Sequence, residues 1–228
     1  FSGQTFALTP EEKGREIIQQ VDQLDTGFGD SRAKLQMILT NRSGGESKRV
    51  LEIRTLESTG DGDKSLTIFN SPRDIKGTAF LSFTHAASPD DQWLYLPALK
   101  RVKRISSANK SGPFLGSTYA FEDLTSLEVA RYNYLYVKDE ILDGIDCFLI
   151  EMKPSYEYSG YTRQLSWVDK ERYIIIKTEY YDRKDALLKT QDFKNFKQYL
   201  DKYWRASTQL MVNHQNGKST RLLWEEYQ

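Results

Sequence analysis

The hydrophobic positions of the chain follow two different periods, and the first of these is helical. Residues 9–12 read Thr-Pro-Glu-Glu, which is a helix start: threonine is a good N-cap, proline suits the first helical position, and acids favour the first turn. The spacing that follows predicts one amphipathic helix over residues 10–26, ended by glycines 27 and 29. Its apolar stripe consists of Ile17, Ile18, Val21 and Leu24.

From about residue 31 onward the period changes to two, which is typical of strands. Apolar residues alternate with polar ones in short segments, and turn sequences rich in Gly, Asn, Asp and Pro separate them. Consecutive strands with short connections indicate an antiparallel meander, and the scarcity of helices excludes a parallel βαβ sheet. The pattern predicts about eleven strands: 34–39, 50–56, 66–69, 77–84, 131–137, 147–153, 161–168, 173–181, 186–196, 203–212 and 219–226.

Residues 91–105 hold two further short strand-like runs with a proline-containing turn between them. Alternation places Trp93 and Tyr95 on one face and Leu94 and Leu96 on the other. The pattern leaves open which of the two pairs faces the interior.

An antiparallel sheet of so many strands rarely stays flat and open. We therefore expect a mainly β (α+β) fold in a single domain over residues 1–228, whose one curved sheet forms a half-open barrel. Two elements are available to cover its concave face: the helix at 10–26 and an irregular segment over residues 107–128. Such covers either leave an apolar cavity or fill it.

Composition and charge narrow the class of protein. Lys plus Arg and Asp plus Glu both total 32, and a net charge of zero argues against general nucleic-acid binding. We expect no transmembrane segment, because no run of about 18 apolar residues occurs. One cysteine permits no intrachain disulfide and is compatible with cytosol or periplasm. The chain begins with Phe1 rather than Met, as expected of a mature or trimmed form.

The irregular segment contains Gly-Pro-Phe-Leu-Gly-Ser at residues 112–117. It lacks the Gly-Lys-Ser/Thr ending of a phosphate loop, so a nucleotide site is not expected. Glycines permit hinge motion, and large apolar side chains on a hinge can gate a cavity. Phe114 and Leu115 are therefore interpreted as a mobile flap, with a static plug as the alternative.

Two surface features allow more than one interpretation. The basic run Lys100, Arg101, Lys103 and Arg104 is either a charged strand edge that blocks edge pairing or a docking patch for an acidic partner or anionic lipid headgroups. The tyrosines of residues 155–161 either form a loop rim folded on the sheet or contact a sugar or protein partner.

Catalytic and metal-binding patterns are weak. His85 and His214 lie far apart in sequence with no cysteine at ligand spacing, so no zinc site is expected. Cys147 sits in an apolar strand and is interpreted as a buried inert thiol, with a Cys–His pair as the remaining enzymatic alternative. No catalytic residues, metal or cofactor are predicted.

Three short segments between residues 93 and 124 resemble a known protein family. Trp-Leu-Tyr-Leu-Pro-Ala-Leu-Lys-Arg-Val at 93–102, with Gly-Ser at 116–117 and Phe-Glu-Asp-Leu at 121–124, resembles the outer-membrane lipoprotein-sorting protein family of the LolA-like superfamily. The layout of the rest of the chain is similar. The resemblance implies a periplasmic Gram-negative protein made with a cleaved signal peptide, and a helix-lidded half-barrel that accepts acyl chains. Carriers of this superfamily use an arginine inside the barrel to hold the lid shut, and no position here matches it.

The predicted function is therefore a non-enzymatic periplasmic carrier that binds acyl chains of lipoproteins or lipids for transfer toward the outer membrane. A free lipid or another hydrophobic molecule is an equally good cargo. The partners implied are an inner-membrane transporter and an outer-membrane acceptor, and the carrier is expected to be a monomer. The alternative is an envelope module with a filled core that binds a protein or glycan. The predicted cavity and lid residues are Trp93, Leu94, Tyr95, Leu96, Phe114, Leu115, Phe121, Ile17, Ile18 and Val21, and the predicted docking residues are Lys100, Arg101, Lys103 and Arg104.

Overall fold

The structure is a computed structural model that describes residues 7–228. One α-helix, α1 (Pro10–Asp25), precedes thirteen strands in this part of the chain. The strands are β1 (Asp30–Thr40), β2 (Glu46–Leu56), β3 (Lys64–Ser71), β4 (Ala79–Phe83), β5 (Asp91–Leu96), β6 (Arg101–Ile105), β7 (Tyr132–Leu142), β8 (Ile145–Pro154), β9 (Tyr161–Asp169), β10 (Ile175–Asp182), β11 (Leu187–Tyr199), β12 (Tyr203–Asn213) and β13 (Ser219–Glu225).

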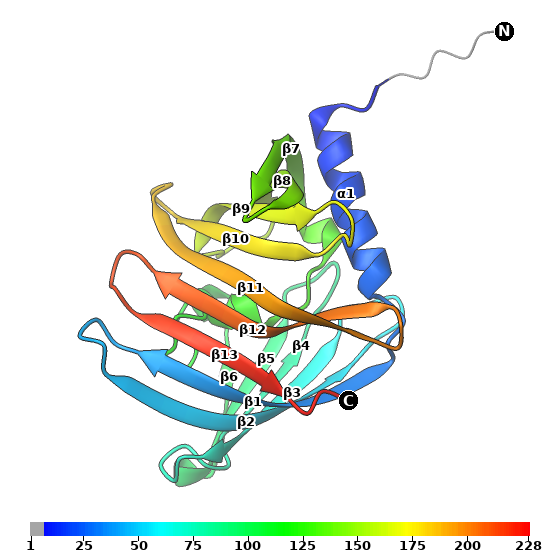
Figure 1. The fold of residues 1–228 in the computed structure, drawn as a ribbon. Coiled ribbons are helices and arrows are strands. Elements are labelled where there is room, and N and C mark those ends of the chain that lie inside the picture. The colour runs from blue at the N-terminus through cyan, green and yellow to red at the C-terminus, as the bar shows by residue number, and fades with distance from the viewer. Residues whose placement is uncertain (1–6) are drawn as a thin grey trace, which may run out of the picture.

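All of these strands belong to one antiparallel sheet in the order β6-β5-β4-β3-β2-β1-β13-β12-β11-β10-β9-β8-β7. The sheet curls, so that β3–β6 lie behind β11–β13 and β1 in Figure 1. The mainly β class is confirmed, but the sheet has thirteen strands rather than about eleven. The difference comes from residues 91–105, whose two short runs pair with each other and with β4 to extend the sheet.

Helix α1 covers the end of the sheet opposite β6 (Figure 1). Thr9 caps it in a capping box with Glu12, as its start sequence indicates. A methyl group on Gly14 would lie 2.7 Å from the backbone nitrogen of Tyr136, so only glycine lets the helix approach β7 this closely. Ile17 and Ile18 are buried against side chains of β7, β8 and β9: Tyr134, Ile150, Met152 and Val168.

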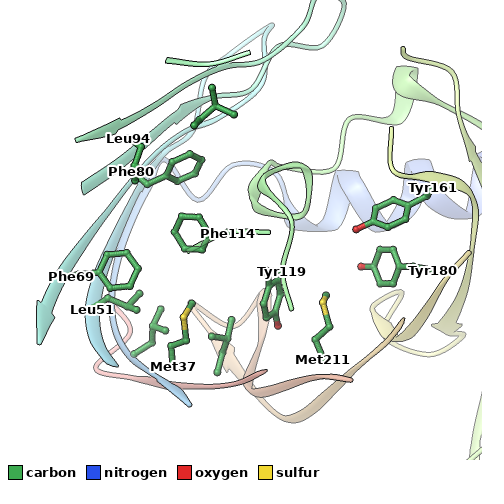
Figure 2. Packing of buried hydrophobic residues seen from close by; sticks show 13 residues of the cluster. Met37, Leu51, Phe69, Phe80, Leu94, Phe114, Tyr119, Tyr161, Tyr180 and Met211 are labelled. Carbon is green, nitrogen blue, oxygen red and sulfur yellow. The ribbon is translucent and has the colours of Figure 1, made fainter. Parts of the chain in front are cut away.

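A second hydrophobic cluster fills the concave side of β1–β5, and its centre is supplied by the irregular segment. We call residues 107–128 the lid segment. Its Phe114 is 1% exposed, with ring centroids 5.9 Å from Phe69 and 5.2 Å from Phe80. Figure 2 shows Phe114 projecting toward the strands that carry Phe69 and Phe80, while Tyr161 and Tyr180 stand on the opposite wall.

Hydrogen bonds make the lid segment compact. The Phe114 amide donates to the Tyr119 carbonyl at 2.7 Å, and the Phe121 amide donates to the Gly112 carbonyl at 3.1 Å. Two short 3-10 helices, Ser107–Asn109 and Phe121–Leu124, flank this loop. Within residues 7–228, no helix is both long and apolar enough to cross a bilayer.

Candidate functional site

A cavity of about 420 Å³ lies between the curled sheet and the lid segment; we call it the inner cavity. Strands β2–β4 contribute Ile53, Thr67 and Phe80 to its wall, and the lid segment contributes residues such as Tyr119 and Leu127. The remaining wall comes from β8–β13 and includes Met152, Ser166, Thr178, Tyr180, Gln191, Phe193, Gln209, Leu222 and Trp224. Most strands of the sheet thus contribute to the wall of one partly open cavity.

A wider space of about 740 Å³, the outer chamber, opens between the C-terminal half of α1 and strands β10–β12. The two spaces adjoin, because six residues line both of them: Thr55, Asp63, Leu127, Ile175, Phe193 and Gln209. The wall of the outer chamber contains large apolar and aromatic side chains: Val21, Leu24, Phe28, Ile174, Ile175, Phe193, Phe196 and Trp204. It also contains seven charged side chains: Asp25, Asp63, Glu171, Arg172, Asp201, Lys202 and Arg205. This is a volume and lining suited to a flexible apolar ligand.

A buried ion pair fastens the lid segment to the sheet. Lys189 of β11 pairs with Asp123, and each side chain is only 3% exposed. Asp123 also accepts hydrogen bonds from the Tyr161 hydroxyl at 2.7 Å and from the Ala120 amide at 2.6 Å, while the Lys189 ammonium donates to the Thr118 carbonyl at 3.2 Å. Because both charges are desolvated, each depends on the other for compensation.

The neighbouring Glu122 fastens the same segment to the loop between β8 and β9. Its carboxylate accepts hydrogen bonds from the Gly160 amide at 2.8 Å, the Ser159 hydroxyl at 2.9 Å and the Tyr156 hydroxyl at 3.3 Å. Burial, followed by the charge of Asp123, raises the pKa of Glu122. The tyrosine-rich loop is thus folded onto the lid segment through Tyr156, while Tyr158 remains 54% exposed.

Two cations lie beside this anchor. Arg131 forms an ion pair with Asp90, and its guanidinium lies 4.5 Å from the centre of the Tyr156 ring. The Lys110 ammonium lies over the same ring at 3.6 Å. Burial, followed by the charge of Arg131, lowers the pKa of Lys110 to about 8. Lys110 forms no salt bridge within residues 7–228, and besides the Tyr156 ring it is influenced by the charges of Arg131, Asp90 and Glu122.

Comparison with known proteins gives three informative relatives. A domain from Vibrio parahaemolyticus named for outer membrane lipoprotein sorting is 56% identical, covers 96% of this chain and 92% of its own, and superposes with a TM-score of 0.94. A DUF1329 family protein from Desulfovibrio piger is 30% identical over 97% of this chain and 93% of its own, with a TM-score of 0.92. The chain belongs to the outer-membrane lipoprotein-sorting protein family.

Two further comparisons concern the fold and a family profile. A LolA superfamily protein from Nitrosomonas europaea, 20% identical, covers 97% of this chain and 94% of its own with a TM-score of 0.76, which shows the shared fold. A protein-family profile described only as an uncharacterized protein matches residues 61–228. Among functionally curated proteins, nothing matches significantly.

The LolA-like fold places most of the predicted cavity residues one layer behind the cavity wall. Phe114 and Phe121 pack against Phe80, which does line the inner cavity, and Leu115 is packed against the same cluster. Leu94 and Leu96 face this cluster from β5. Val21 is the predicted residue that lines the outer chamber.

The remaining predicted residues lie away from both spaces. Trp93 and Tyr95 are on the opposite face of β5 from Leu94, and Trp93 packs edge-on against Phe83 at 5.4 Å. This settles which strand face is inner. Ile17 and Ile18 fix α1 to β7–β9 rather than covering the cavity.

The predicted docking residues gather on a hairpin at one edge of the sheet. Lys100 occupies the turn between β5 and β6, and Arg101, Lys103 and Arg104 lie exposed on the edge strand β6. Val102, between them, is 64% exposed, and Arg104 pairs with Asp91.

Sequence reasoning missed the polar wall of the inner cavity. Buried hydroxyl and amide side chains such as Thr67, Ser166, Thr178 and Gln191 occupy inward positions of their strands. Alternation alone assigns polar residues to the solvent face, so it gives no sign that these strands line a polar cavity. The signal in the sequence is that some inward positions of 161–168 and 173–181 carry polar residues, such as Ser166 and Thr178, where an apolar core would require large apolar ones.

The residues considered for catalysis are not brought together. The Cys147 thiol is fully buried, bonds to the Ile145 carbonyl, and has a pKa raised by burial to about 11. His85 instead bonds to Asp61 at 2.7 Å, and His214 lies 3.1 Å from the Thr190 hydroxyl. In the described residues, His, Cys, Asp and Glu side chains form no group able to hold a metal ion.

Proposed function

We propose that this domain is a non-enzymatic carrier of acyl chains, belonging to lipoproteins or lipids, between the membranes of a Gram-negative cell. The observation that carries the proposal is the pair of adjoining spaces, the outer chamber and the inner cavity, whose volumes are about 740 and 420 Å³. Unfilled space favours a carrier over an interaction module with a packed core. The name of the Vibrio relative, which refers to outer membrane lipoprotein sorting, supports the envelope setting.

The energetics of an apolar ligand suit this role. Each buried methylene contributes about 0.8 kcal/mol, so a chain of about 14 methylenes supplies on the order of 10 kcal/mol before the cost of ordering is subtracted. A carrier with such affinity needs help to release its cargo. We therefore propose an inner-membrane transporter as donor and an outer-membrane acceptor as partners in the periplasm.

We further propose that the basic hairpin around β6 is the surface that meets a membrane. The hairpin carries four basic residues: Lys100, Arg101, Lys103 and Arg104. Only Arg104 forms a salt bridge within the described residues, with Asp91. The exposed Leu99 and Val102 lie among them. Basic side chains around a small apolar tip match the chemistry of an anionic lipid surface.

Mass spectrometry of organic extracts tests the carrier proposal. The protein is purified without detergent and its extract is compared with that of two variants. Phe193→Glu places a charge in the wall shared by the two spaces, whereas Ile141→Glu changes a side chain that is 73% exposed on β7. We expect stoichiometric acyl lipid in the wild type and in Ile141→Glu and at least a tenfold loss in Phe193→Glu.

An extract without lipid, from folded protein that also fails to take up a fluorescent fatty acid or monoacylglycerol, would contradict the carrier proposal. In that event the alternative, a module that binds an envelope protein or glycan, would gain support.

A further inference from the structure

The inner cavity is unexpectedly polar for a site that holds a hydrocarbon. Hydroxyl and amide groups reach into it from strands on both walls: Thr55, Ser65, Thr67, Gln164, Ser166, Thr178, Gln191 and Gln209. A polar group buried against an alkyl chain loses its hydrogen bonds to water and gains none. The outer chamber combines large apolar side chains with charged ones, of which Arg172 and Arg205 are paired with Asp169 and Asp25. The two spaces therefore differ in the kind of polar group: mostly uncharged hydroxyls and amides in the inner cavity, and mostly charged side chains in the outer chamber.

Several of the deep polar groups form a network with donors to spare. The Gln191 carbonyl accepts from the Tyr180 hydroxyl at 2.8 Å, which fixes the orientation of this amide. Its nitrogen then donates to the Tyr119 hydroxyl and to the Gln209 carbonyl, both at 3.3 Å. The Tyr119 hydroxyl hydrogen and the Gln209 amide hydrogens have no acceptor among residues 7–228.

A third donor of the same wall is also unpaired. The indole nitrogen of Trp224 is buried and has no hydrogen-bond partner in the described chain, the one such buried side-chain atom there. An indole nitrogen can only donate. Unsatisfied buried polar groups are rare enough that each calls for an explanation. The inner cavity is lined by all three of these residues, Tyr119, Gln209 and Trp224. Its unpaired hydrogen-bonding groups are therefore donors, which need an acceptor.

The charges of the wall indicate which acceptor fits. Its ionisable side chains other than tyrosine are Asp63, Glu122 and Asp123, and it contains no lysine, arginine or histidine. Lys189 approaches from behind, but its charge is balanced by Asp123. An anionic ligand group would meet the carboxyl groups of Asp63 and Glu122 and no free cation. A neutral carbonyl, ether or hydroxyl oxygen meets donors without that repulsion.

We infer that the cargo is a neutral acyl ester or amide bound polar end first, with its carbonyl region hydrogen-bonded in the inner cavity and its hydrocarbon chain in the outer chamber beneath α1. This inference rests on the proposed carrier function and specifies its ligand. A free fatty carboxylate in the same orientation would be the poorer cargo, because its charge would lie in a cavity lined by carboxyl groups and no cation. Gln209, which lines both spaces, lies at the junction where the carbonyl and the first methylenes meet.

Competition binding tests the selectivity. A fluorescent acyl probe is bound to the wild type and to the double variant Tyr119→Phe/Gln209→Leu, and it is then displaced with 1-monopalmitoylglycerol or with palmitate. Both ligands are kept below their critical micelle concentrations at pH 7.4. We expect the ester to bind at least tenfold more tightly than palmitate to the wild type. The double variant should lose about tenfold in ester affinity and change less than threefold toward palmitate, because only the ester uses the donors.

Fluorescence quenching tests the orientation without altering the donors. A monoacylglycerol brominated at its terminal carbon is titrated into the wild type and into Trp204→Phe and Trp224→Phe. Trp204 lines the outer chamber and Trp224 the inner cavity. We expect most of the quenching to disappear in Trp204→Phe and to persist in Trp224→Phe.

The outcomes separate this inference from the carrier proposal. If palmitate binds as tightly as the ester, or if quenching disappears in Trp224→Phe instead, the inference is wrong while the carrier proposal stands. If neither ligand binds to folded protein, the carrier proposal itself fails.

Discussion

Lys189 and Asp123 illustrate how single charged residues hold this LolA-like domain in its closed form. Both side chains are 3% exposed, and the pair joins the middle of the lid segment to β11. The tyrosine hydroxyl and backbone amide that also bond to Asp123 make its position specific. A buried pair of this kind adds little net stability compared with apolar residues, but removing one partner leaves the other uncompensated.

Lys189→Met is accordingly expected to lower the free energy of unfolding by about 3–5 kcal/mol, since Asp123 would remain buried without its counter-charge. Lys189→Met/Asp123→Asn should recover part of the loss. Lys34→Met provides the control, because Lys34 and its partner Glu226 are 45% and 62% exposed, and it should change stability by less than about 1 kcal/mol. Urea unfolding measures all three. A loss below 1 kcal/mol for Lys189→Met would show that the pair does not hold the lid segment.

Lys110 gives a prediction about pH. Its pKa falls from an ordinary value of 10.5 to about 8 in the folded protein because of burial and the charge of Arg131. Between these two values the unfolded chain binds more protons at this position, so the Lys110 contribution to stability rises with pH. The stability of the wild type relative to Lys110→Met should therefore increase between pH 8 and pH 10 and stay level from pH 6 to 7. Parallel unfolding curves across this range would contradict the lowered pKa.

At the scale of elements, the lid segment resembles a plug more than a flap in this conformation. Its hydrogen-bonded loop, its two charged anchors and the burial of Phe114 all oppose opening. The outer chamber, by contrast, opens along α1 and does not require this segment to move.

Hydrogen exchange distinguishes the two behaviours. We expect the amides of Phe114, Phe121 and Glu122 to be protected to a degree similar to those of β11, because their acceptors lie within a buried loop. Exchange is measured residue by residue with and without bound lipid. Rapid exchange of these three amides in the free protein, with protection restored by lipid, would instead support the flap.

Helix α1 depends on one glycine. Replacing a mid-helix glycine by alanine usually stabilises a protein by up to about 1 kcal/mol. At Gly14 the added methyl group would meet the Tyr136 nitrogen at 2.7 Å, so Gly14→Ala is expected to destabilise instead, by about 1–3 kcal/mol. The exposed Glu16→Ala serves as the control and should be near neutral. A stabilising Gly14→Ala in thermal unfolding would mean that α1 is seated more loosely on β7.

For the whole molecule, local periodicity predicted the class of fold and little of the site. The alternating segments and Thr9-capped helix correspond to elements of the structure, since each depends on neighbouring residues. The cavity wall depends instead on which residues of distant strands face each other, such as Thr67 of β3 and Thr178 of β10. Nothing within one strand tells a polar residue that faces a cavity from one that faces solvent.

The two edges of the sheet differ in what covers them and in their charge. Helix α1 covers the β7 edge, whereas the β6 edge is exposed and carries Arg101, Lys103 and Arg104. Since the chain as a whole has a net charge of zero, this local excess is not a general property of its surface. Each basic residue near an anionic bilayer contributes about 1 kcal/mol, and the attraction is screened by salt.

Charge reversal at this edge therefore provides a specific test of docking. Arg101→Glu/Lys103→Glu should weaken binding to vesicles of phosphatidylglycerol and phosphatidylcholine by at least tenfold in 50 mM salt, and the difference should shrink as salt increases. Lys194→Glu/Lys197→Glu makes the same change in net charge on exposed positions of β11 and should weaken binding only slightly. Co-sedimentation measures both. Equal losses in the two variants would show that net charge alone drives the interaction, and binding only to an acidic protein partner would reassign the hairpin to that partner.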